Sequence, residues 1–319
     1  MKKWVLILAA LLALLITGAA AEDVPMYEAM VNDDVFLVSD TVGGPSYGPI
    51  ADGQKVIVYE LGDEWCRVEY KGQMGYCKTR WLYHYRSLDP FRFSVPQMQD
   101  TIGFASFMET CFLSGGKFNG IDVQAGAIFC VSQEVDEGYL LPVWRGETQV
   151  AKEDVTFYPF VSWQDAQPGD IIGGFTTFYS AQQGKGRAME REHNIQVGCQ
   201  RIHETVLKPD AYFSFNRACA PYSKKNGYLY APNISKTGYG YGGGVCQVTT
   251  TLYNAVLTLP LQVDEWALHK YNGVAYVPQF FDAAVGSYTD LVFKNTMPYA
   301  IRLAAMAQDG VLTVLIFRH

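Results

Sequence analysis

The chain has 319 residues, of which 49% are hydrophobic, 18% charged and 14% aromatic, a composition typical of folded globular domains rather than disordered chains. A single hydrophobic core stops growing near about 250–300 residues, so we expect two or three domains. The net charge of −7, without a long run of Lys or Arg, excludes the charge pattern typical of proteins that bind nucleic acid or an anionic membrane surface.

Residues 1–21 have the three parts of a secretory signal peptide. Lys2 and Lys3 form the positive start, residues 4–16 are apolar, and residues 19–21 supply the small side chains that precede a cleavage site. We therefore expect an exported protein whose mature form begins after residue 21. An uncleaved membrane anchor is the alternative, because residues 4–21 reach the lower length limit of a membrane-spanning helix.

Residues 22–86 predict a small β-barrel. Short runs rich in β-branched and aromatic residues occur at 35–38, 54–59, 65–70 and 75–77, and Gly, Asp and Pro turns separate them. Their order resembles that of bacterial SH3-like domains, which in exported proteins often bind the cell wall.

The cysteine count is odd for an exported protein, so at least one thiol has no partner. The seven cysteines are Cys66, Cys77, Cys111, Cys130, Cys199, Cys219 and Cys246. If Lys71 and Gly72 form a two-residue hairpin turn, Cys66 and Cys77 lie directly opposite each other, within reach of a disulfide. The alternative, which the sequence favours as much as a disulfide, is that Cys66 and Cys77 are two buried free thiols. We expect Cys246 to be unpaired.

Residues 95–160 echo the first β segment and predict a second SH3-like module. Strand-like runs, an acidic turn and a turn that contains Gly recur in the same order. The spacing from Gly53 to Gly72 in the first segment and from Gly126 to Gly146 in the second differs by only one residue. Residues 87–99, which contain two prolines, are the expected linker. The modules are expected to hold the protein near the wall as units separable from its chemistry.

From residue 163 onward the pattern changes, and residues 163–319 predict an α+β domain. Apolar residues at helical spacing indicate helices over 190–203 and 248–259. Strands are expected at 291–293, 300–305 and 311–317, with a hairpin turn at Asp309 and Gly310.

The most informative motif is a run of glycines that ends at a cysteine. Gly242, Gly243 and Gly244 precede Cys246, which lies at the start of a predicted helix. Unpaired N–H groups and the helix dipole lower the pKa of a thiol there and can hold an oxyanion, while glycines leave room for a substrate carbonyl. The motif predicts a cysteine nucleophile for acyl transfer, with a buried structural cysteine as the alternative.

A cysteine nucleophile needs a base, and the same half of the chain offers His193, His203 and His269. The pattern of residues leaves the choice among them open. Cys199 and His203 are four residues apart on one predicted helix, but the sequence has no second pair at metal-ligand spacing. We expect neither a metal nor a cofactor.

Sequence blocks in the last half of the chain resemble the VanW domain over about residues 173–317. The blocks are residues 191–195, 209–216, 242–254, 269, 276–278, 282–285 and 290–295. Two positions depart from the usual pattern of the family: Asp210 stands where Gly is usual, and Trp266 where Arg is usual.

The resemblance implies a bacterial cell-envelope protein, and some members of the family are regarded as L,D-transpeptidases of peptidoglycan with the cysteine of the Gly-rich loop as nucleophile. In this chain that residue is Cys246. His269 is the preferred base, His193 the alternative, and Asp282 would orient the base. The substrate and oxyanion loop would comprise Gly242, Gly243, Gly244 and Gln247, and the substrate-binding residues would be Arg187, Arg191 and Asn194.

These assignments predict a secreted, wall-associated monomer that acts on peptidoglycan stem peptides. Cys246 would form an acyl-enzyme with the third residue of one stem, and an amine of a neighbouring stem would resolve it. Aromatic residues near the motif are expected to keep water out and so favour transfer; they are Tyr239, Tyr241, Tyr253 and Trp266. A non-catalytic peptidoglycan-binding protein and a cysteine carboxypeptidase or other hydrolase are the alternatives.

Overall fold

The computed structural model of the chain describes residues 24–62, 64–88, 101–115, 118–143, 146–179, 187–234, 237–269, 274–278 and 281–319. The expected signal peptide and residues 89–99 of the expected linker lie outside these ranges. Within the described part of the chain, no helix is both long and apolar enough to cross a membrane.

The first β segment is an antiparallel sheet. Its elements are β1 (Tyr27–Val31), β2 (Val35–Val38), β3 (Ser46–Ile50), β4 (Lys55–Leu61), β5 (Trp65–Tyr70), β6 (Gln73–Lys78), the 3-10 turn η1 (Thr79–Trp81) and β7 (Leu82–Ser87). Alternate side chains are buried, as in Val56 and Val58 of β4, because one face of each strand packs on the core. The predicted strands of this segment are therefore confirmed.

The hairpin of β5 and β6 has the predicted register. Lys71 and Gly72 both have positive φ, 51° and 81°, the conformation that a tight hairpin turn requires, and Cys66 pairs with Cys77 across the strands. Both thiols are free and fully buried, and burial raises the pKa of Cys66 to about 11. The structure therefore has the second of the two expected arrangements, a pair of buried thiols.

The strands of the first segment do not form the expected closed barrel. Their order along the sheet is β7-β1-β4-β5-β6-β2-β3, and β7 gives its outer edge to β21 (Gln262–Trp266), a strand of the C-terminal domain. An edge strand that pairs with another domain is not available to close a barrel within its own segment.

The second β segment repeats part of the pairing pattern of the first, although its strands form three separate sheets. It comprises β8 (Gly103–Phe107), β9 (Cys111–Gly115), β10 (Phe118–Val123), β11 (Ile128–Val131), β12 (Gln133–Val135), β13 (Gly138–Val143), β14 (Gly146–Ala151), the 3-10 turn η2 (Lys152–Asp154) and β15 (Val155–Pro159). The sheets are β11-β8-β15, β10-β9 and β12-β13-β14. Strand β8 pairs with β11 and β15 as β1 pairs with β4 and β7. In both segments a 3-10 turn precedes the last strand.

The C-terminal domain has three main helices, α1 (Ala188–Ile202), α2 (Phe215–Cys219) and α3 (Val245–Leu257), and a short 3-10 turn, η3 (Lys224–Asn226). Its other strands are β16 (Ile171–Phe178), β17 (Val206–Leu207), β18 (Tyr212–Ser214), β19 (Tyr230–Pro232), β20 (Tyr239–Tyr241), β22 (Val292–Lys294), β23 (Ile301–Gln308) and β24 (Val311–Arg318). The chain is thus strand-rich α+β, as predicted, and the two long helices lie where the apolar spacing placed them.

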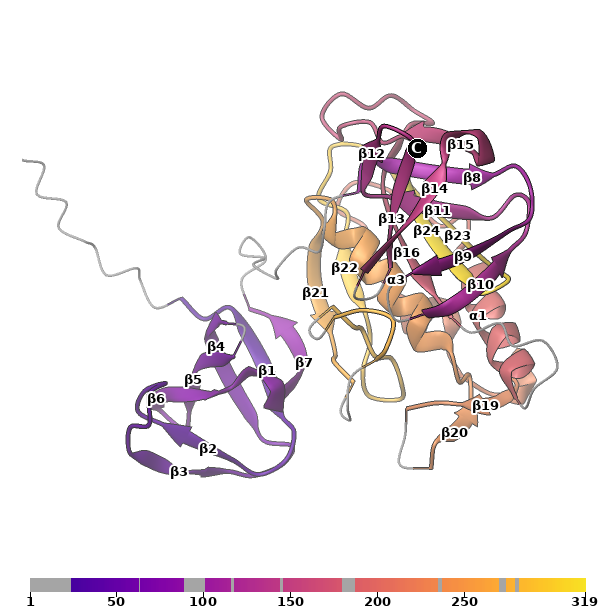
Figure 1. The fold of residues 1–319 in the computed structure, drawn as a ribbon. Coiled ribbons are helices and arrows are strands. Elements are labelled where there is room, and N and C mark those ends of the chain that lie inside the picture. The colour runs from indigo at the N-terminus through magenta and orange to yellow at the C-terminus, as the bar shows by residue number, and fades with distance from the viewer. Residues whose placement is uncertain are drawn as a thin grey trace, which may run out of the picture.

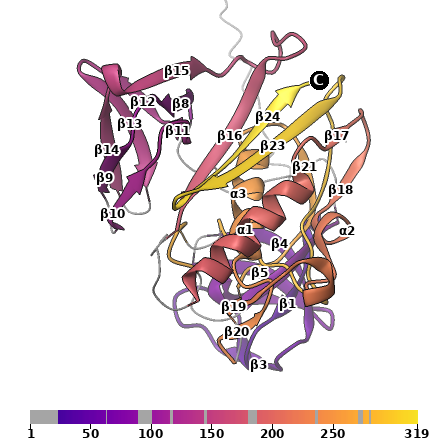
Figure 2. The ribbon, with the colours of Figure 1, turned by 90° about the vertical axis from the view of Figure 1, so that its right-hand side faces the viewer.

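A four-stranded sheet, β16-β24-β23-β17, forms the middle layer of this domain. Helices α1 and α3 pack on one face of it, and the β8–β15 segment packs on the other (Figure 2). A hydrogen bond from Cys130 N–H to Thr176 Oγ1, 2.9 Å long, joins β11 to β16. The second β segment is therefore part of the same packed body as α3.

The first segment joins the C-terminal domain through one continuous sheet (Figure 1). Trp266 pairs with Tyr85 across β21 and β7, and the two rings stack with centroids 4.7 Å apart. The Tyr27 ring contacts Trp266 edge-on at 5.2 Å, and His84 Nε2 lies 2.8 Å from a carboxylate oxygen of Glu265. The first segment is therefore tied to the C-terminal domain by buried aromatic rings and by the contact between His84 and Glu265, rather than by a linker alone.

We expect Trp266→Ala to lower the free energy of unfolding by about 3–5 kcal/mol, because it removes a fully buried ring from the junction of two domains. Trp65→Ala is the control, since this ring is half-buried and its contact is a cation–π pair with Lys78, so about 1 kcal/mol is expected. Urea unfolding of both variants gives the comparison. Equal losses would contradict the proposed importance of the junction.

Candidate active site

The glycine run fixes how α3 begins. Gly244 is the N-cap of α3 with φ of 106°, a left-handed conformation that favours glycine, and Cys246 follows in the first turn. A Cβ on Gly243 would stand 2.4 Å from Pro232 O, and one on Gly244 would stand 2.9 Å from Arg191 O. Two of the three glycines are therefore required by close packing against β19 and α1, a role that the sequence did not reveal.

Cys246, His269 and Asp282 lie together at this end of α3. The Cys246 thiol hydrogen-bonds the His269 side chain, and His269 Nδ1 lies 2.7 Å from Asp282 Oδ2. The same carboxylate oxygen accepts the backbone N–H of His269 at 2.7 Å. The three residues thus form a chain of hydrogen bonds with the order that a nucleophile, a base and an orienting carboxylate require.

The environment favours an ion pair between the cysteine and the histidine. Burial alone would raise the pKa of Cys246, but the hydrogen bond and charge of His269 and the Val285 N–H, 3.5 Å from Sγ, lower it below its ordinary value. Burial opposes the charging of His269, yet hydrogen bonds to Asp282 and Cys246 raise its pKa to about 10. A thiolate beside an imidazolium is the form ready for nucleophilic attack.

One backbone N–H group at the start of α3, that of Cys246, is open to bind an oxyanion. The N–H of Val245 donates to Gly242 O at 3.0 Å and that of Gln247 to Gly244 O at 2.9 Å, whereas the N–H of Cys246 has no backbone acceptor among the described residues. An open amide on the nucleophile itself, at the positive end of a helix, is suited to hold the charge that develops on an attacked carbonyl.

Gln247 does not offer a free group to substrate. Its Nε2 donates to Thr177 Oγ1 and to Phe178 O, both at 3.0 Å, and its Oε1 accepts Arg191 Nη2 at 2.7 Å. The side chain is buried and serves to tie β16 to Arg191. The expected role of Gln247 in the oxyanion loop is therefore replaced by a role in holding Arg191.

A pocket of about 510 Å³ opens over the thiol. It is lined by Cys246, His269, Gly242, Gly244, Arg191 and Tyr241, among others, and Arg191 is the only Lys or Arg of its lining within the described ranges. Burial lowers the pKa of the Arg191 guanidinium, but this group stays charged at any physiological pH. The pocket thus combines a nucleophile with one fixed positive charge.

Two other expected substrate-binding residues lie elsewhere. Asn194 is fully buried; its Nδ2 donates to Leu229 O and Gly243 O and its Oδ1 accepts the Leu229 N–H, so it holds the glycine run in place. Arg187 does not line the pocket, and its guanidinium lies over the rings of Tyr230 and Tyr239. The assignment of both to direct contact with the stem peptide in the pocket is corrected.

The other two histidine candidates, His193 and His203, have their hydrogen-bond partners outside the pocket. His193 Nε2 lies 2.9 Å from Gly227 O on the exposed side of α1, and His203 Nδ1 accepts the Ala305 N–H at 3.2 Å. Neither residue lines the pocket. Only His269 of the three candidates is in contact with Cys246.

The aromatic residues expected around the thiol separate into two groups. Tyr241 lines the pocket and Tyr239 is exposed nearby, but Tyr253 and Trp266 are fully buried and stack on each other at 6.1 Å, toward the junction with β7. The expectation that all four wall the site is wrong, because the face of α3 that carries Tyr253 turns into the core.

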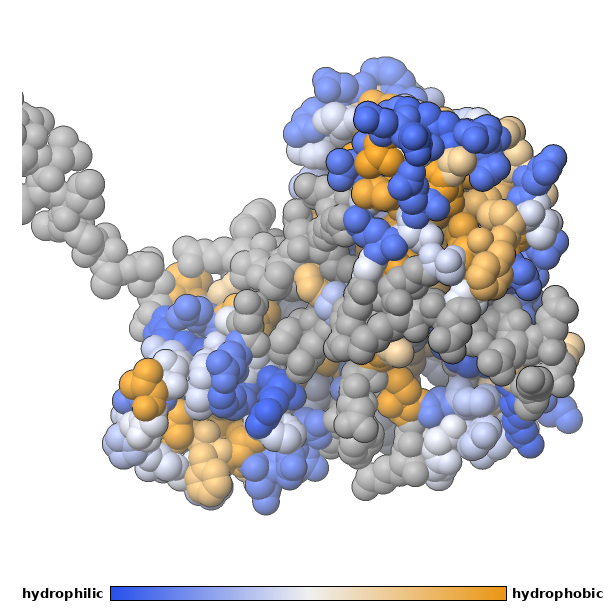
Figure 3. Space-filling model, in the orientation of Figure 1, coloured by the Kyte–Doolittle hydropathy of each residue, from blue (hydrophilic) through white to orange (hydrophobic). Residues whose placement is uncertain are grey.

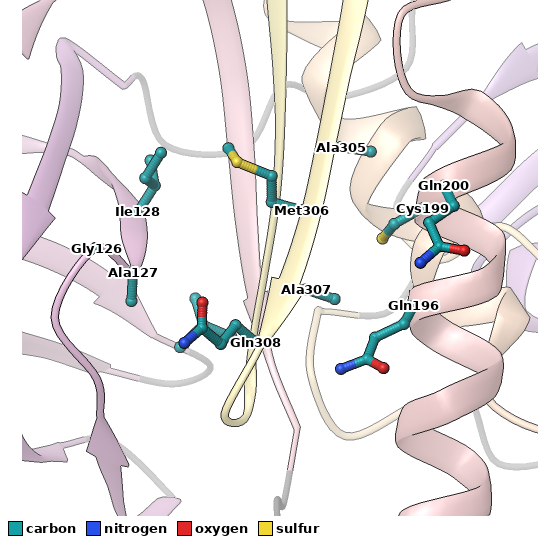
Figure 4. Close-up of a pocket in the computed structure, with 11 residues that line it drawn as sticks. Gly126, Ala127, Ile128, Gln196, Cys199, Gln200, Ala305, Met306, Ala307 and Gln308 are labelled. Atoms are coloured by element: carbon teal, nitrogen blue, oxygen red, sulfur yellow. The ribbon is translucent and has the colours of Figure 1, made fainter.

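A second pocket, of about 440 Å³, lies between α1, β23 and the second β segment (Figure 4). Of the described residues that line it, one is a thiol, Cys199, whose pKa is raised by burial, and none is a histidine. Among the described residues, no group of three or more His, Cys, Asp or Glu side chains could hold a metal ion. The pocket at Cys246 is therefore the candidate active site.

Alkylation by iodoacetamide across pH tests the ion pair. In a Cys111→Ser background, which removes the other half-exposed thiol, Cys246 should react with a midpoint below the ordinary thiol value of about 8.5. Asp282→Asn should move the midpoint upward, because His269 loses the carboxylate that keeps it protonated, whereas Asp264→Asn on β21 should not. A wild-type midpoint near 8.5 that Asp282→Asn leaves in place would refute the ion pair.

Gly244→Ala should destabilise the protein more than Gly238→Ala. Both residues have positive φ, which costs an alanine about 1–2 kcal/mol, but a Cβ at Gly238 meets open space while one at Gly244 is 2.9 Å from Arg191 O. Overpacking adds about 1–3 kcal/mol at Gly244. Urea unfolding measures the difference; equal losses would show that α1 does not press on the loop.

Comparisons with known proteins agree with the resemblance in part. Residues 190–317 match the family described as VanW like protein. The chain is 32% identical over 178 residues to the uncharacterized protein YoaR of Bacillus subtilis (strain 168), an alignment that covers 54% of this chain and 57% of that protein. The chain thus spans less than two thirds of the relative's length.

A solved structure of an NlpC/P60 family protein from Bacillus cereus ATCC 10987 is 12% identical and covers 50% of this chain and 85% of its own, with a TM-score of 0.17. A score this low does not indicate a shared fold.

The resemblance predicted over residues 173–317 is confirmed for most of its length. Residues 190–317, which carry Cys246, His269 and Asp282, form a VanW-like domain.

Proposed function

We propose that the protein is an exported cell-wall enzyme, an L,D-transpeptidase that transfers acyl groups between peptidoglycan stem peptides through Cys246. The observation that carries the proposal is the hydrogen-bonded chain of Cys246, His269 and Asp282 beside the open amide of Cys246. A structural cysteine has no need of a buried imidazole and carboxylate, and their burial is costly without a function.

In the first step the Cys246 thiolate attacks the carbonyl carbon of the third stem residue. The carbonyl oxygen takes the negative charge, which the Cys246 N–H and the start of α3 stabilise. The His269 imidazolium donates its proton to the nitrogen of the terminal D-amino acid, and the C–N bond breaks. The products are a thioester on Cys246 and a free D-amino acid.

In the second step an amine of a neighbouring stem attacks the thioester. The now neutral His269 accepts the proton of this amine, the new C–N bond forms, and the C–S bond breaks to restore the thiolate. Asp282 keeps Nδ1 of His269 protonated through both steps, so that Nε2 alone exchanges the proton.

Arg191 is proposed to bind the carboxylate of the terminal D-amino acid. Nη2 of Arg191 donates to Gln247, which holds the side chain in place, and Arg191 lines the pocket over Cys246. A guanidinium fork matches a carboxylate in shape and charge, and a buried site excludes the water that would screen the pair. The preference for a free carboxyl end follows from this contact.

The two β segments are proposed to be SH3-like modules that bind the wall. In both segments the first strand pairs with the fourth and with the last, and a 3-10 turn precedes the last strand, which supports this. Hydrophobic side chains reach the surface of both segments (Figure 3), with Phe36 62% exposed on β2 and Phe112 61% exposed on β9. Exposed aromatic rings at equivalent hairpins are typical of a recognition surface.

Intact-mass analysis tests the proposal. The mature chain mixed with a tetrapeptide stem should gain the mass of the tripeptide acyl group, and Cys246→Ala should gain none. Cys111→Ser is the matched control and should be acylated like the wild type. The absence of an adduct and of any product would contradict the enzyme proposal and support a non-catalytic binding protein.

Adding an acceptor amine in excess distinguishes transfer from hydrolysis. A transpeptidase yields the cross-linked or exchanged product in excess over free tripeptide. If tripeptide predominates at every acceptor concentration, the enzyme is a carboxypeptidase.

A further inference from the structure

A two-stranded ribbon next to the candidate active site presents only apolar and aromatic side chains on its outer face. In this ribbon, formed by β19 and β20, Tyr230 pairs with Tyr241 and Pro232 with Tyr239. Because side chains alternate along a strand, these four lie on one face. The alternate residues include Ala231, which is fully buried, so the other face packs on the protein.

The outer face is exposed to solvent. Tyr230, Tyr239 and Tyr241 are 43%, 46% and 43% exposed, and the ribbon lies at an edge of the molecule, far from the β8–β15 segment (Figures 1 and 2). Three partly exposed rings on one short ribbon form a contiguous patch rather than scattered surface residues. We call these three tyrosines and Pro232 the tyrosine face.

The ribbon is held rigidly, as a binding surface requires. Asn194 Nδ2 binds Leu229 O just before β19, and Gly243 packs so closely that its Cβ would lie 2.6 Å from Ala231 O. The rings also brace each other, since Tyr230 and Tyr239 stack at 6.3 Å and Tyr241 meets Tyr230 edge-on at 5.5 Å. Little conformational freedom would be lost when a ligand binds.

The tyrosine face continues into the pocket. Pro232 and Tyr241 belong both to the face and to the lining of the pocket over Cys246. A ligand that lies across the face therefore reaches the thiol without a break. None of the four residues of the tyrosine face carries a charge, but the guanidinium of Arg187 lies over the rings of Tyr230 and Tyr239 and donates to Tyr230 O at 3.1 Å.

We propose that the tyrosine face binds the sugar rings of the glycan strand while the attached stem peptide enters the pocket. This inference rests on the proposed function and names the second half of its substrate. A pyranose ring has flat C–H surfaces that stack on aromatic rings and hydroxyls that pair with tyrosine OH groups, a combination of an apolar body and a polar edge that tyrosine matches. The face itself is rich in hydroxyls, and the one guanidinium described beside it, that of Arg187, can also hydrogen-bond to hydroxyls, which suits a polymer of neutral sugar rings better than a highly charged partner.

The test uses full-length mature protein with Cys246→Ala, so that binding is measured without turnover, and a β-1,4-linked N-acetylglucosamine hexamer that contains no peptide. Calorimetry should show saturable binding, and adding Tyr239→Ala should weaken it about 5- to 10-fold. The control is Tyr212→Ala, because Tyr212 is 52% exposed on β18 and belongs to neither the face nor the pocket. It should change binding by less than twofold.

A second readout uses the active enzyme. Tyr239→Ala should lower kcat/KM about 5- to 10-fold on a disaccharide-tetrapeptide and leave it unchanged on the bare tetrapeptide. Equal losses on both substrates, equal weakening of hexamer binding by Tyr212→Ala, or binding only to lipid vesicles would overturn the proposal. Hexamer binding that depends on Tyr239 without any acyl-enzyme would keep the tyrosine face and refute the transpeptidase, whereas acylation without hexamer binding would do the reverse.

Discussion

The hydrogen bond between His269 and Asp282 is the contact on which the candidate site depends. Both side chains are nearly buried, so each depends on the other for a hydrogen-bond partner that water cannot supply. One carboxylate oxygen of Asp282 accepts both the backbone N–H and the ring Nδ1 of His269, which fixes the position and the tautomer of the ring. Cys246 then acquires a lowered pKa because a fixed imidazolium lies beside it.

The first β segment packs against the strand that leads to His269, β21, and so supports this contact. Trp266 precedes His269 by three residues and stacks on the rings of Tyr85 from β7 and Tyr253 from α3, the helix that carries Cys246 in its first turn. The strand that leads to the base and the helix that carries the nucleophile thus share one aromatic stack with the N-terminal sheet. Trp266 departs from the usual Arg of the VanW pattern, and the docked Tyr85 gives a physical reason for an apolar ring there.

Local features could be predicted from the sequence, and distant pairings could not. Turn residues and apolar spacing within a few residues predict three features correctly. These are the start of α3, the pairing of Cys66 with Cys77, and helix α1. Asp210, where Gly is usual, has φ of 64°, so the departure keeps the conformation. The pairing of β7 with β21 joins residues about 180 apart, and the role of Asn194 depends on a loop 49 residues away. Neither the strand pairing nor the loop contact has a local signal in the sequence. The prediction of a closed barrel and the prediction that Asn194 contacts substrate were therefore wrong.

The most direct test of the account is the protonation state of His269, measured from the ring ¹⁵N chemical shifts of the mature protein between pH 5 and pH 9 (about the range over which an ordinary histidine titrates). The account predicts that both ring nitrogens stay protonated up to the pKa of about 10, and that Cys246→Ala lets His269 become neutral at lower pH, because the thiolate that favours its charge is gone. A wild-type His269 that loses its proton near pH 6.5 would contradict the thiolate–imidazolium pair.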